Sequence, residues 1–304
     1  MRSLILLSAS LAALPAFAEV AGEDGWQHSF PVEQYTFTST GKNKYWSLKP
    51  GNFVVLGLME ADGSEYVKIS VLDETELVDG VETRVVEERE FENGELVEIS
   101  RNFYAMAKET GDVFYFGEDV DYFEDGEVVR HDGEWRAGVN DAKPGLYMPG
   151  KPAVGMKYYM EYDPSRAMDR AEIFEVDATC EMPWETFDNC LVITEGSPLE
   201  PGDESYKRYA PKVGMIYDDS LEVWKHGNRR PSEQLVELRI PEDRMPKVPR
   251  DIVYQLHPTG EVREVKVEIH PMHTLYAIET FIDGKTQWDV EVTDSGEVLR
   301  NTPD

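Results

Sequence analysis

Residues 81–106 read VETRVVEEREFENGELVEISRNFYAM and predict a β-hairpin. Both halves belong to runs rich in Val, Ile, Tyr and Phe, and Asn93-Gly94, a dipeptide typical of two-residue hairpin turns, stands between them. Outward from this segment, further Asp-Gly dipeptides separate runs rich in Val, Ile, Tyr and Phe, at residues 62–63, 79–80, 125–126 and 132–133. No window between residues 53 and 240 keeps the period of an α-helix together with helix caps. The sequence therefore predicts a mainly β body of antiparallel strands.

The body also repeats itself at a spacing of roughly 104 residues. Residues 51–53 correspond to 155–158, residues 81–83 to 184–186, and residues 103–115 to 208–217. This predicts two tandem antiparallel β-units, about 47–118 and 151–220, that form curved half-barrel-like sheets and cover each other's open faces. Chance similarity between two β-meanders is the alternative. The Gly- and Pro-rich segment 135–152 between the units is expected to be a loop.

Charge limits the partners that the protein can have. The chain of 304 residues carries 60 acidic and 30 basic side chains, which gives a formal net charge of −30. Such a charge repels nucleic acid and anionic lipid surfaces, and it excludes DNA binding and polybasic membrane docking. Hydrophobic residues make up 41%, enough for a packed core. The natural partners are therefore cations or basic surfaces, although a saline habitat would also explain the acidity.

The first eighteen residues have the pattern of a secretory signal peptide. Arg2 carries a positive charge, residues 4–17 are almost entirely apolar or small, and Ala16-Phe17-Ala18 is the pattern that signal peptidase reads. An uncleaved anchor is the alternative. No cysteine follows Ala18, which disfavours a lipid anchor, and no later stretch is apolar over the length of a transmembrane helix. We expect cleavage after Ala18, a periplasmic or extracellular location and no transmembrane segment.

Cys180 and Cys190 flank a nine-residue segment between two strand-like runs. A hairpin brings such positions within the Cα separation of a disulfide, and export exposes them to oxidising conditions. A redox-active pair needs closer spacing and an electropositive helix start, and neither is visible. The sequence predicts a structural disulfide between the two, which stabilises by about 3 kcal/mol because the loop is short.

Residues 42–227 resemble a widespread group of uncharacterised secreted bacterial β-rich proteins. The resemblance rests on five motifs: LKPG (48–51), VFYFGED (113–119), GEWRAG (133–138), KPGLYMP (143–149) and YAPKVG (209–214). It implies a precedent for the fold and brings no known activity.

The tail has a different pattern after Pro246. Val248, Ile252, Val253 and Leu256 recur at helical spacing, and Pro249 is tolerated because it falls in the first turn. Strand-like runs follow at residues 262–269, 275–282, 287–293 and 298–299, with turns at 283–284 and 294–296. The sequence thus predicts a duplicated β-rich domain over 19–245 and a small α+β module over 246–304.

This tail resembles the PepSY-like modules of exported bacterial proteins. The resemblance rests on HPTGEV (257–262) and on residues 276–299. Such modules are regarded as small binding or inhibitory domains, so the resemblance implies a non-catalytic role. A generic α+β tail is the alternative.

Motifs of common enzyme classes are missing from the sequence. It has no Gly-rich phosphate loop, no Gly-x-Ser-x-Gly, no His-Glu-x-x-His and no Cys-x-x-Cys. The six histidines are scattered, and sixty carboxylates make any chosen acid pair uninformative. We therefore predict that the protein is not an enzyme and assign no catalytic residue.

The densest acidic segment is a candidate calcium site. Calcium takes six to eight hard oxygen ligands, which such a segment can partly supply. The candidate ligands are Asp119, Asp121, Glu124 and Asp125. An EF-hand loop starting at Asp121 fails because Phe123 stands where a ligand belongs. The alternative is a hairpin whose acids face water.

A second candidate metal site lies at residues 270–273, His-Pro-Met-His. If Pro271-Met272 forms the turn of a hairpin, the imidazoles of His270 and His273 oppose each other, with the thioether of Met272 close by. Imidazole and thioether suit a soft or borderline ion such as copper. Polar residues decorating a hairpin are the alternative. No cofactor follows from the sequence beyond these calcium and copper candidates.

Three functions remain open. The first is a secreted, non-catalytic binding protein that holds a hydrophobic ligand or a protein segment in a groove lined by inward aromatic side chains: Phe53, Phe91, Phe103, Tyr104, Phe114, Tyr158, Trp184 and Tyr209. The second is cation binding or buffering by calcium or copper ligands. The third is an inhibitor or chaperone acting through the tail. The expected partner is an unknown small ligand or an exported protein.

Overall fold

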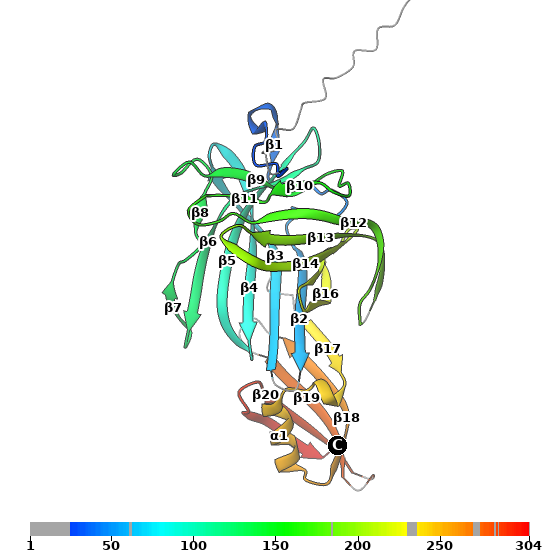
Figure 1. Cartoon of the computed structure of the whole chain (residues 1–304). Helices are drawn as coiled ribbons and strands as arrows, with labels where there is room; N and C mark the ends of the chain where they lie inside the picture. Colours follow the sequence, from blue (N-terminus) through cyan, green and yellow to red (C-terminus); the bar gives the residue numbers. More distant parts are fainter. Residues whose placement is uncertain are drawn as a thin grey trace, which may run out of the picture.

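The computed structural model describes residues 25–60, 63–183, 185–229, 236–269, 274–282, 284 and 286–303. They form a barrel-like body with a small C-terminal module at one end (Figure 1). The prediction of a mainly β fold is confirmed, since the described residues contain one α-helix, α1 (Lys247–Leu256), and the short 3-10 helices η1 (Val32–Gln34) and η3 (Glu242–Arg244). None of these helices combines the length and the apolar character that a transmembrane helix requires.

The strands of the body are β1 (Phe37–Thr38), β2 (Asn52–Glu60), β3 (Gly63–Val78), β4 (Val81–Glu92), β5 (Glu95–Ala107), β6 (Val113–Glu124), β7 (Glu127–Arg130), β8 (Trp135–Arg136), β9 (Lys143–Met148), β10 (Lys157–Tyr159), β11 (Glu161–Tyr162), β12 (Arg170–Glu181), β13 (Thr186–Ser197), β14 (Glu200–Ala210), β15 (Gly214–Asp218) and β16 (Leu221–Asn228). They form a nearly closed antiparallel barrel in the order β10-β12-β13-β14-β15-β16-β2-β3-β4-β5-β6-β9-β11. β1 pairs with β5, and β7 and β8 pair with β6.

Left-handed dipeptides make the turns of the first meander, as the sequence predicts. Asn93 and Gly94 have φ values of 51° and 82° between β4 and β5. Asp79-Gly80 and Asp125-Gly126 adopt the same conformation between β3 and β4 and between β6 and β7. Two successive residues with positive φ are the signature of the hairpin turn that matches the twist of the strands. These turns explain why the long strands follow each other without crossovers.

The prediction of a loop over residues 135–152 is wrong. β8 and β9 lie within this segment, and β9 pairs with both β6 and β11 near the seam of the barrel. Pro144 stands near the start of β9, where a proline is tolerated. A Cβ on Gly145 would lie 2.2 Å from the carbonyl oxygen of Met160, so glycine permits this close approach. Glycine and proline therefore mark a crowded strand here and not a linker.

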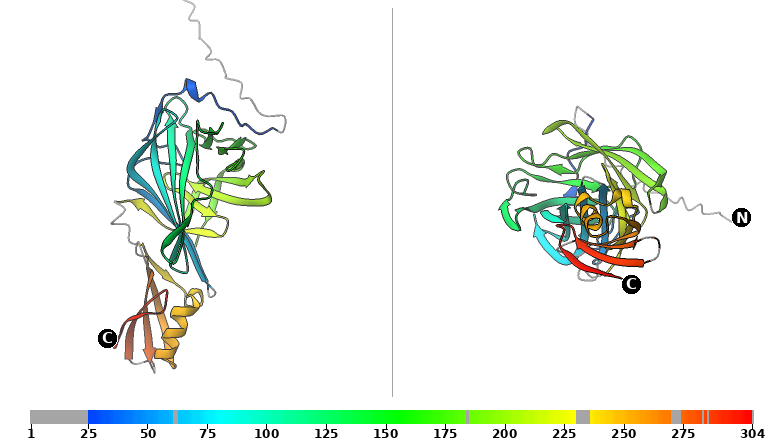
Figure 2. Two further views of the ribbon diagram at one scale, coloured as in Figure 1. Left: turned by 90° about the vertical axis from the view of Figure 1, so that its left-hand side faces the viewer. Right: turned by 90° about the horizontal axis from the view of Figure 1, so that it is seen from below.

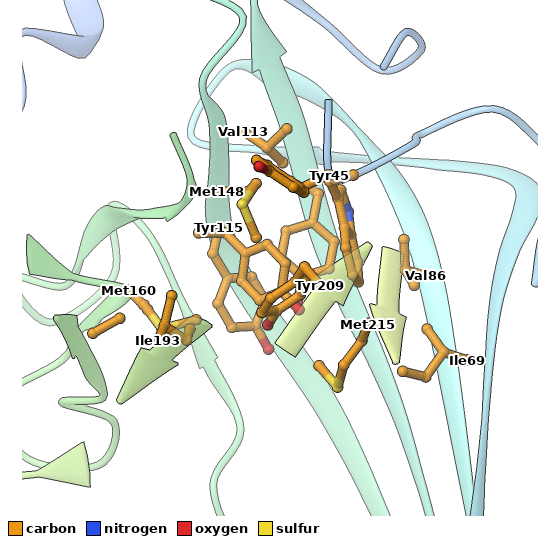
Figure 3. Close-up of a cluster of buried hydrophobic side chains, with 14 of the residues drawn as sticks. Tyr45, Ile69, Val86, Val113, Tyr115, Met148, Met160, Ile193, Tyr209 and Met215 are labelled. Carbon is orange, nitrogen blue, oxygen red and sulfur yellow. The ribbon is translucent and has the colours of Figure 1, made fainter. Parts of the chain in front are cut away.

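Aromatic side chains fill one end of the barrel. Trp46 packs on Tyr147 with the ring centroids 4.7 Å apart, and Tyr104 packs on Tyr147 and on Tyr115 at 4.6 Å each. Tyr45 extends this cluster and donates a hydrogen bond to the carbonyl oxygen of Asn189. Figure 3 shows Tyr45, Tyr115 and Tyr209 gathered among sulfur-containing and aliphatic side chains. The segment before β2 therefore acts as a plug for this end of the body.

The C-terminal module is a five-stranded antiparallel sheet with α1 against it (Figure 2). Its strands, in sheet order, are β17 (Val236–Ile240), β18 (Gly260–Ile269), β19 (Thr274–Ile282), β20 (Thr286–Thr293) and β21 (Val298–Pro303). The predicted helix is confirmed, and β17 lies before Pro246, where the sequence analysis begins the tail.

A second hydrophobic core joins this module to the outer face of the barrel. It combines Phe53, Val55, Met59, Tyr66 and Phe91 of the body with Ile240, Met245, Val253, Val265, Val267, Ile269, Tyr276, Ile278, Val290 and Val292 of the module. The hydroxyl groups of Tyr66 and Thr274 lie 3.3 Å apart across this junction. The junction is therefore an apolar interface with a polar contact inside it.

Candidate functional site

An acidic cavity of about 320 Å³ lies inside the barrel, between β4–β6 on one side and β13–β15 on the other. The segment 160–169, which leads into β12, lines a third side. Among the residues that the structure describes, the basic side chains on the wall are Arg166 and Lys207. Nine carboxylate side chains line it: Glu88, Glu90, Glu98, Glu118, Glu161, Asp169, Glu195, Glu200 and Asp218. We refer to this space as the acidic cavity.

Strand alternation puts these carboxylates inside. On β4, Glu88 and Glu90 face the cavity, whereas Glu87 and Arg89 face outward, where Arg89 Nε lies 2.7 Å from Glu87 Oε1. Successive side chains of a strand point to opposite faces, so a run of charged residues charges both faces of the sheet. The inner face of β4 therefore has no apolar residue at these positions.

Strand register brings inward carboxyls close together. Glu90 is the cross-strand partner of Glu98, and Glu118 is the partner of Asn102. Burial, partly offset by Lys207, raises the pKa of Glu88 to about 8. Burial and then the charge of Glu98 raise the pKa of Glu90 to about 7, and burial likewise raises that of Glu118 to about 7. Some of these carboxyls therefore hold a proton at neutral pH.

The opposite wall carries one ion-paired lysine. Lys207 Nζ lies 3.0 Å from Glu195 Oε1 and 3.3 Å from Asp218 Oδ2. Burial alone would lower the pKa of Lys207, but the two carboxylates outweigh it and hold this pKa well above its usual range. Glu195 Oε2 is buried and has no hydrogen-bond partner within the described residues. Lys207 therefore offsets negative charge on its own wall, whereas the facing carboxyls Glu88, Glu90 and Glu118 form no ion pair with any residue that the structure describes.

Segment 160–169 adds two more carboxyls. Burial, followed by the charges of Glu118 and Asp169, raises the pKa of Glu161 well above its usual range. Burial also raises the pKa of Asp169. The repulsion between Glu161 and Glu118 shows that the acids of different walls interact across the cavity.

Tyrosines close the end of the cavity that faces the aromatic plug. Tyr104, Tyr115 and Tyr147 line it, and the hydroxyl of Tyr115 donates a hydrogen bond to Asn102 Oδ1. Asn102 Nδ2 donates in turn to the carbonyl oxygen of Val86, at 3.2 Å, and to Ser100 Oγ, at 3.0 Å. This network fixes the side chain of Asn102 and the orientation of the tyrosine above it.

A second cavity of about 290 Å³ adjoins the acidic cavity. Both are lined by Glu88, Glu90 and Asp218. The second cavity adds the carboxylates Glu65, Glu92 and Asp219, together with apolar side chains that include Val67 and Ile69. The acidic tract thus extends from the tyrosines toward the turn between β15 and β16.

The carboxylates do not form a metal cage. Across the residues that the structure describes, no group of three or more His, Cys, Asp or Glu side chains is arranged to hold a metal ion. The acids are spread along the walls, so their negative charge is distributed and not focused on one point.

The predicted calcium ligands lie outside the acidic cavity. Asp119 Oδ1 lies 2.7 Å from Arg136 Nη2, and Asp121 pairs with Arg101 and with His131, whose Nδ1 is 3.0 Å from Asp121 Oδ1. Both side chains are on the face of β6 opposite to Glu118, because they stand one and three positions along the strand.

The remaining calcium candidates are placed at the far end of the same strand. Glu124 is exposed at the end of β6, and Asp125 is exposed in the left-handed turn that follows. The structure brings neither of them together with Asp119 or Asp121 around one point.

Other predicted features lie outside the described residues. These are the signal peptide at residues 1–18, Trp184, and the copper candidates His270, Met272 and His273. The copper site and the signal peptide stay predictions.

Cys180 and Cys190 are buried free thiols on the paired strands β12 and β13. Burial and then the neighbouring thiol of Cys180 raise the pKa of Cys190 to about 12. Cys180 pairs in register with Phe187, and Cys190 pairs with Ala178 across an irregular stretch of the ladder. The two thiols are neighbours, and the disulfide stays a prediction.

The aromatic residues proposed for an apolar groove are core residues. Phe53 and Phe91 face outward into the second core beneath the C-terminal module. The others within the described residues belong to the main core: Phe103, Tyr104, Phe114, Tyr158 and Tyr209. Of this group only Tyr104 lines the acidic cavity.

Sequence reasoning missed the acidic cavity although a signal was present. The run Glu87-Glu88-Arg89-Glu90 on β4 leaves neither face of the strand apolar, and the polar residues Glu98, Ser100 and Asn102 recur at every second position of β5. Two neighbouring strands with a polar inner face indicate a water-filled interior. The facing carboxyls on β11 and β13 come from distant sequence, so their position needs the closed barrel.

Comparison of the chain with protein-family models, with curated proteins and with solved structures finds no match. The two family resemblances therefore stay predictions, and the function has to be argued from the cavity.

Proposed function

We propose that the protein is a non-catalytic binding protein that holds a small organic cation in the acidic cavity. The observation that carries this proposal is the charge of the wall, where, among the described residues, nine carboxylate side chains and two basic ones surround about 320 Å³. A cavity of this volume is of the size that holds small ligands. The proposal narrows the cation-binding hypothesis to one place in the barrel.

The raised pKa values explain why a cation is favoured. Glu88, Glu90 and Glu118 hold protons because burial and mutual repulsion oppose their ionised forms. An ammonium group supplies the missing positive charge and several N–H donors, so it favours ionisation of the same carboxyls. Binding at neutral pH is therefore coupled to the release of protons.

An organic cation fits better than a metal ion. A divalent metal needs several oxygens at short distance from one point, and the described carboxylates do not converge in that way. A hydrophobic ligand is also disfavoured, because the aromatic side chains expected to line a groove are packed in the two cores. Amine groups on a flexible carbon chain can reach carboxylates that are spread along a wall.

Isothermal titration with putrescine at pH 7, in two buffers of different ionisation enthalpy, tests the proposal. We expect one putrescine per chain and an apparent enthalpy that depends on the buffer, because protons leave the cavity. Affinity should rise between pH 6 and pH 9 as the carboxyls ionise. Absence of binding by putrescine and by other small amines would overturn the proposal.

A matched pair of variants locates the site. Glu88→Gln removes an acidic-cavity carboxyl and is expected to weaken putrescine binding by about tenfold. Glu127→Gln removes the same charge from an exposed position on β7, outside the cavity, and is expected to have no effect. Equal losses in the two variants would assign the binding to the surface charge of the protein.

The proposal also includes the export of the protein, the duplication of its β-unit and the resemblance of its C-terminal module to a known family. We infer a periplasmic or extracellular protein made of two tandem β-units and a PepSY-like module. Duplication is supported by strand order, since β2–β6 and β10 with β12–β15 occur in the same sequence along the sheet. The matched motifs also fall at equivalent strand ends, residues 103–105 in β5 and 208–210 in β14.

A further inference from the structure

We propose that the cation is a linear polyamine whose ammonium groups occupy both the acidic cavity and the second cavity. This inference rests on the proposed function and adds the class of the ligand. Its basis is that the two cavities adjoin each other and share Glu88, Glu90 and Asp218 on their walls.

The second cavity adds further negative charge to that of the acidic cavity. It adds Glu65, Glu92 and Asp219 and is lined by no basic side chain within the described part of the chain. Glu65 and its cross-strand partner Glu92 are both solvent-exposed, and partial desolvation, followed by the charges of Glu92, Asp218 and Asp219, raises the pKa of Glu65. A single ammonium group in the acidic cavity would leave the carboxylates of the second cavity without a cationic partner.

One buried oxygen on the wall points to a hydrogen-bonding ligand. Glu195 lines the acidic cavity, and its Oε2 is buried without a hydrogen-bond partner among the described residues, while its Oε1 pairs with Lys207. A carboxylate oxygen can accept N–H groups, and buried polar atoms are normally paired.

The alternation of acidic and apolar walls favours a linear chain over a compact cation. Val67 and Ile69 line the second cavity as the cross-strand partners of Glu90 and Glu88, and Met215 is on the wall of the acidic cavity. A polyamine presents methylene groups between its ammonium groups, so its two kinds of surface match the two kinds of wall. Because one molecule engages both cavities, the second contact is intramolecular and strengthens binding.

A titration series tests this inference, with putrescine, spermidine and spermine as probes in moderate salt. We expect one molecule per chain throughout and an affinity for spermine at least about tenfold higher than for putrescine. Glu65→Gln, which alters only the second cavity, should lower the ratio of spermine to putrescine affinity by about fivefold or more. Glu127→Gln, with the same change of charge on exposed β7, should leave this ratio unchanged.

The outcomes separate the two proposals. If no amine binds, the proposed function fails. If putrescine binds but spermine gains nothing, or Glu65→Gln leaves the ratio intact, the linear polyamine is overturned while the cation site stands. If Glu65→Gln does not fold, Glu92→Gln, at the cross-strand partner, replaces it. Several spermine molecules per chain, lost equally in the Glu127→Gln control, would also overturn the inference, because they bind to surface charge.

Discussion

Protonation of Glu88, inside the barrel, makes the stability of the folded protein depend on pH. Its pKa is about 8 in the folded protein, against an ordinary value of 4.5. The folded state therefore binds this proton more tightly than the unfolded state does, and stability falls as pH rises from about 4.5 through 8. The stabilising effect of the proton is fully present below the lower value and is lost above the higher one.

Glu88→Gln should remove the loss of folding stability that accompanies ionisation of Glu88 at high pH. We expect the variant to be more stable than the parent by about 1–2 kcal/mol at pH 8.5, after allowance for water in the cavity, because a pKa unit corresponds to about 1.4 kcal/mol. Thermal unfolding should show this as a rise in Tm of roughly 2–8 °C at pH 8.5 and little change at pH 4.5. Glu127→Gln serves as the control. A Tm difference that is the same at both pH values would contradict this role of Glu88.

The turn of the β4–β5 hairpin is one of the places where the barrel contacts the C-terminal module. A Cβ on Gly94 would lie 1.5 Å from Asp294 Oδ2, so the turn and the module are in direct contact. Gly80 has a similar positive φ, 77° against 82°, but a Cβ there would meet nothing within 4 Å. Substitutions at these two glycines therefore distinguish two effects: the backbone strain of the turn, which both share, and the contact with the module, which only Gly94 makes.

Gly80→Ala and Gly94→Ala form a matched pair. Gly80→Ala should cost about 1–2 kcal/mol, the strain of a left-handed residue with a side chain. Gly94→Ala carries the same strain and also displaces Asp294, so it should cost about 1–3 kcal/mol more. Midpoints of denaturant unfolding measure both costs. Equal midpoints for the two variants would show that the turn does not support the module.

The hairpin turns and the helix of the C-terminal module were largely predictable from the sequence, whereas the acidic cavity was not. The Asn-Gly and Asp-Gly turns and the helix after Pro246 follow from local chemistry, so pattern alone identifies them. The strand β9 was missed because its proline and glycine serve close packing against β11 and not a turn. Glu161 and Glu195 lie opposite Glu88 only after distant strands have closed the barrel, and no local pattern encodes that.

The stability of the whole molecule includes a contribution from the junction between the barrel and the C-terminal module. Phe53, Val55, Tyr66 and Phe91 are apolar or aromatic residues on the outer face of the body, and the C-terminal sheet covers them. Without this cover they would form an exposed hydrophobic patch, which soluble proteins avoid. The module therefore shares the second hydrophobic core with the outer face of the body.

Removal of residues 236–304 should destabilise the barrel even though its own strands remain. We expect the truncated chain to bind a hydrophobic dye, to self-associate and to unfold at a lower temperature than the full chain. Dye fluorescence, light scattering and thermal unfolding measure these effects. A truncated chain that is monomeric, binds no extra dye and keeps its Tm would show that the junction contributes nothing to stability.

The pairing of β2 with β16 governs when the barrel can form. β2 is the first long strand of the body, and one of its two neighbours in the sheet lies roughly 170 residues later in the chain. A ribosome delivers β2 long before its partner, so most of the polypeptide must be made before the two edges can meet. Because β2 and β16 pair late, we expect the barrel to fold slowly. The polypeptide then remains incompletely folded during most of its synthesis.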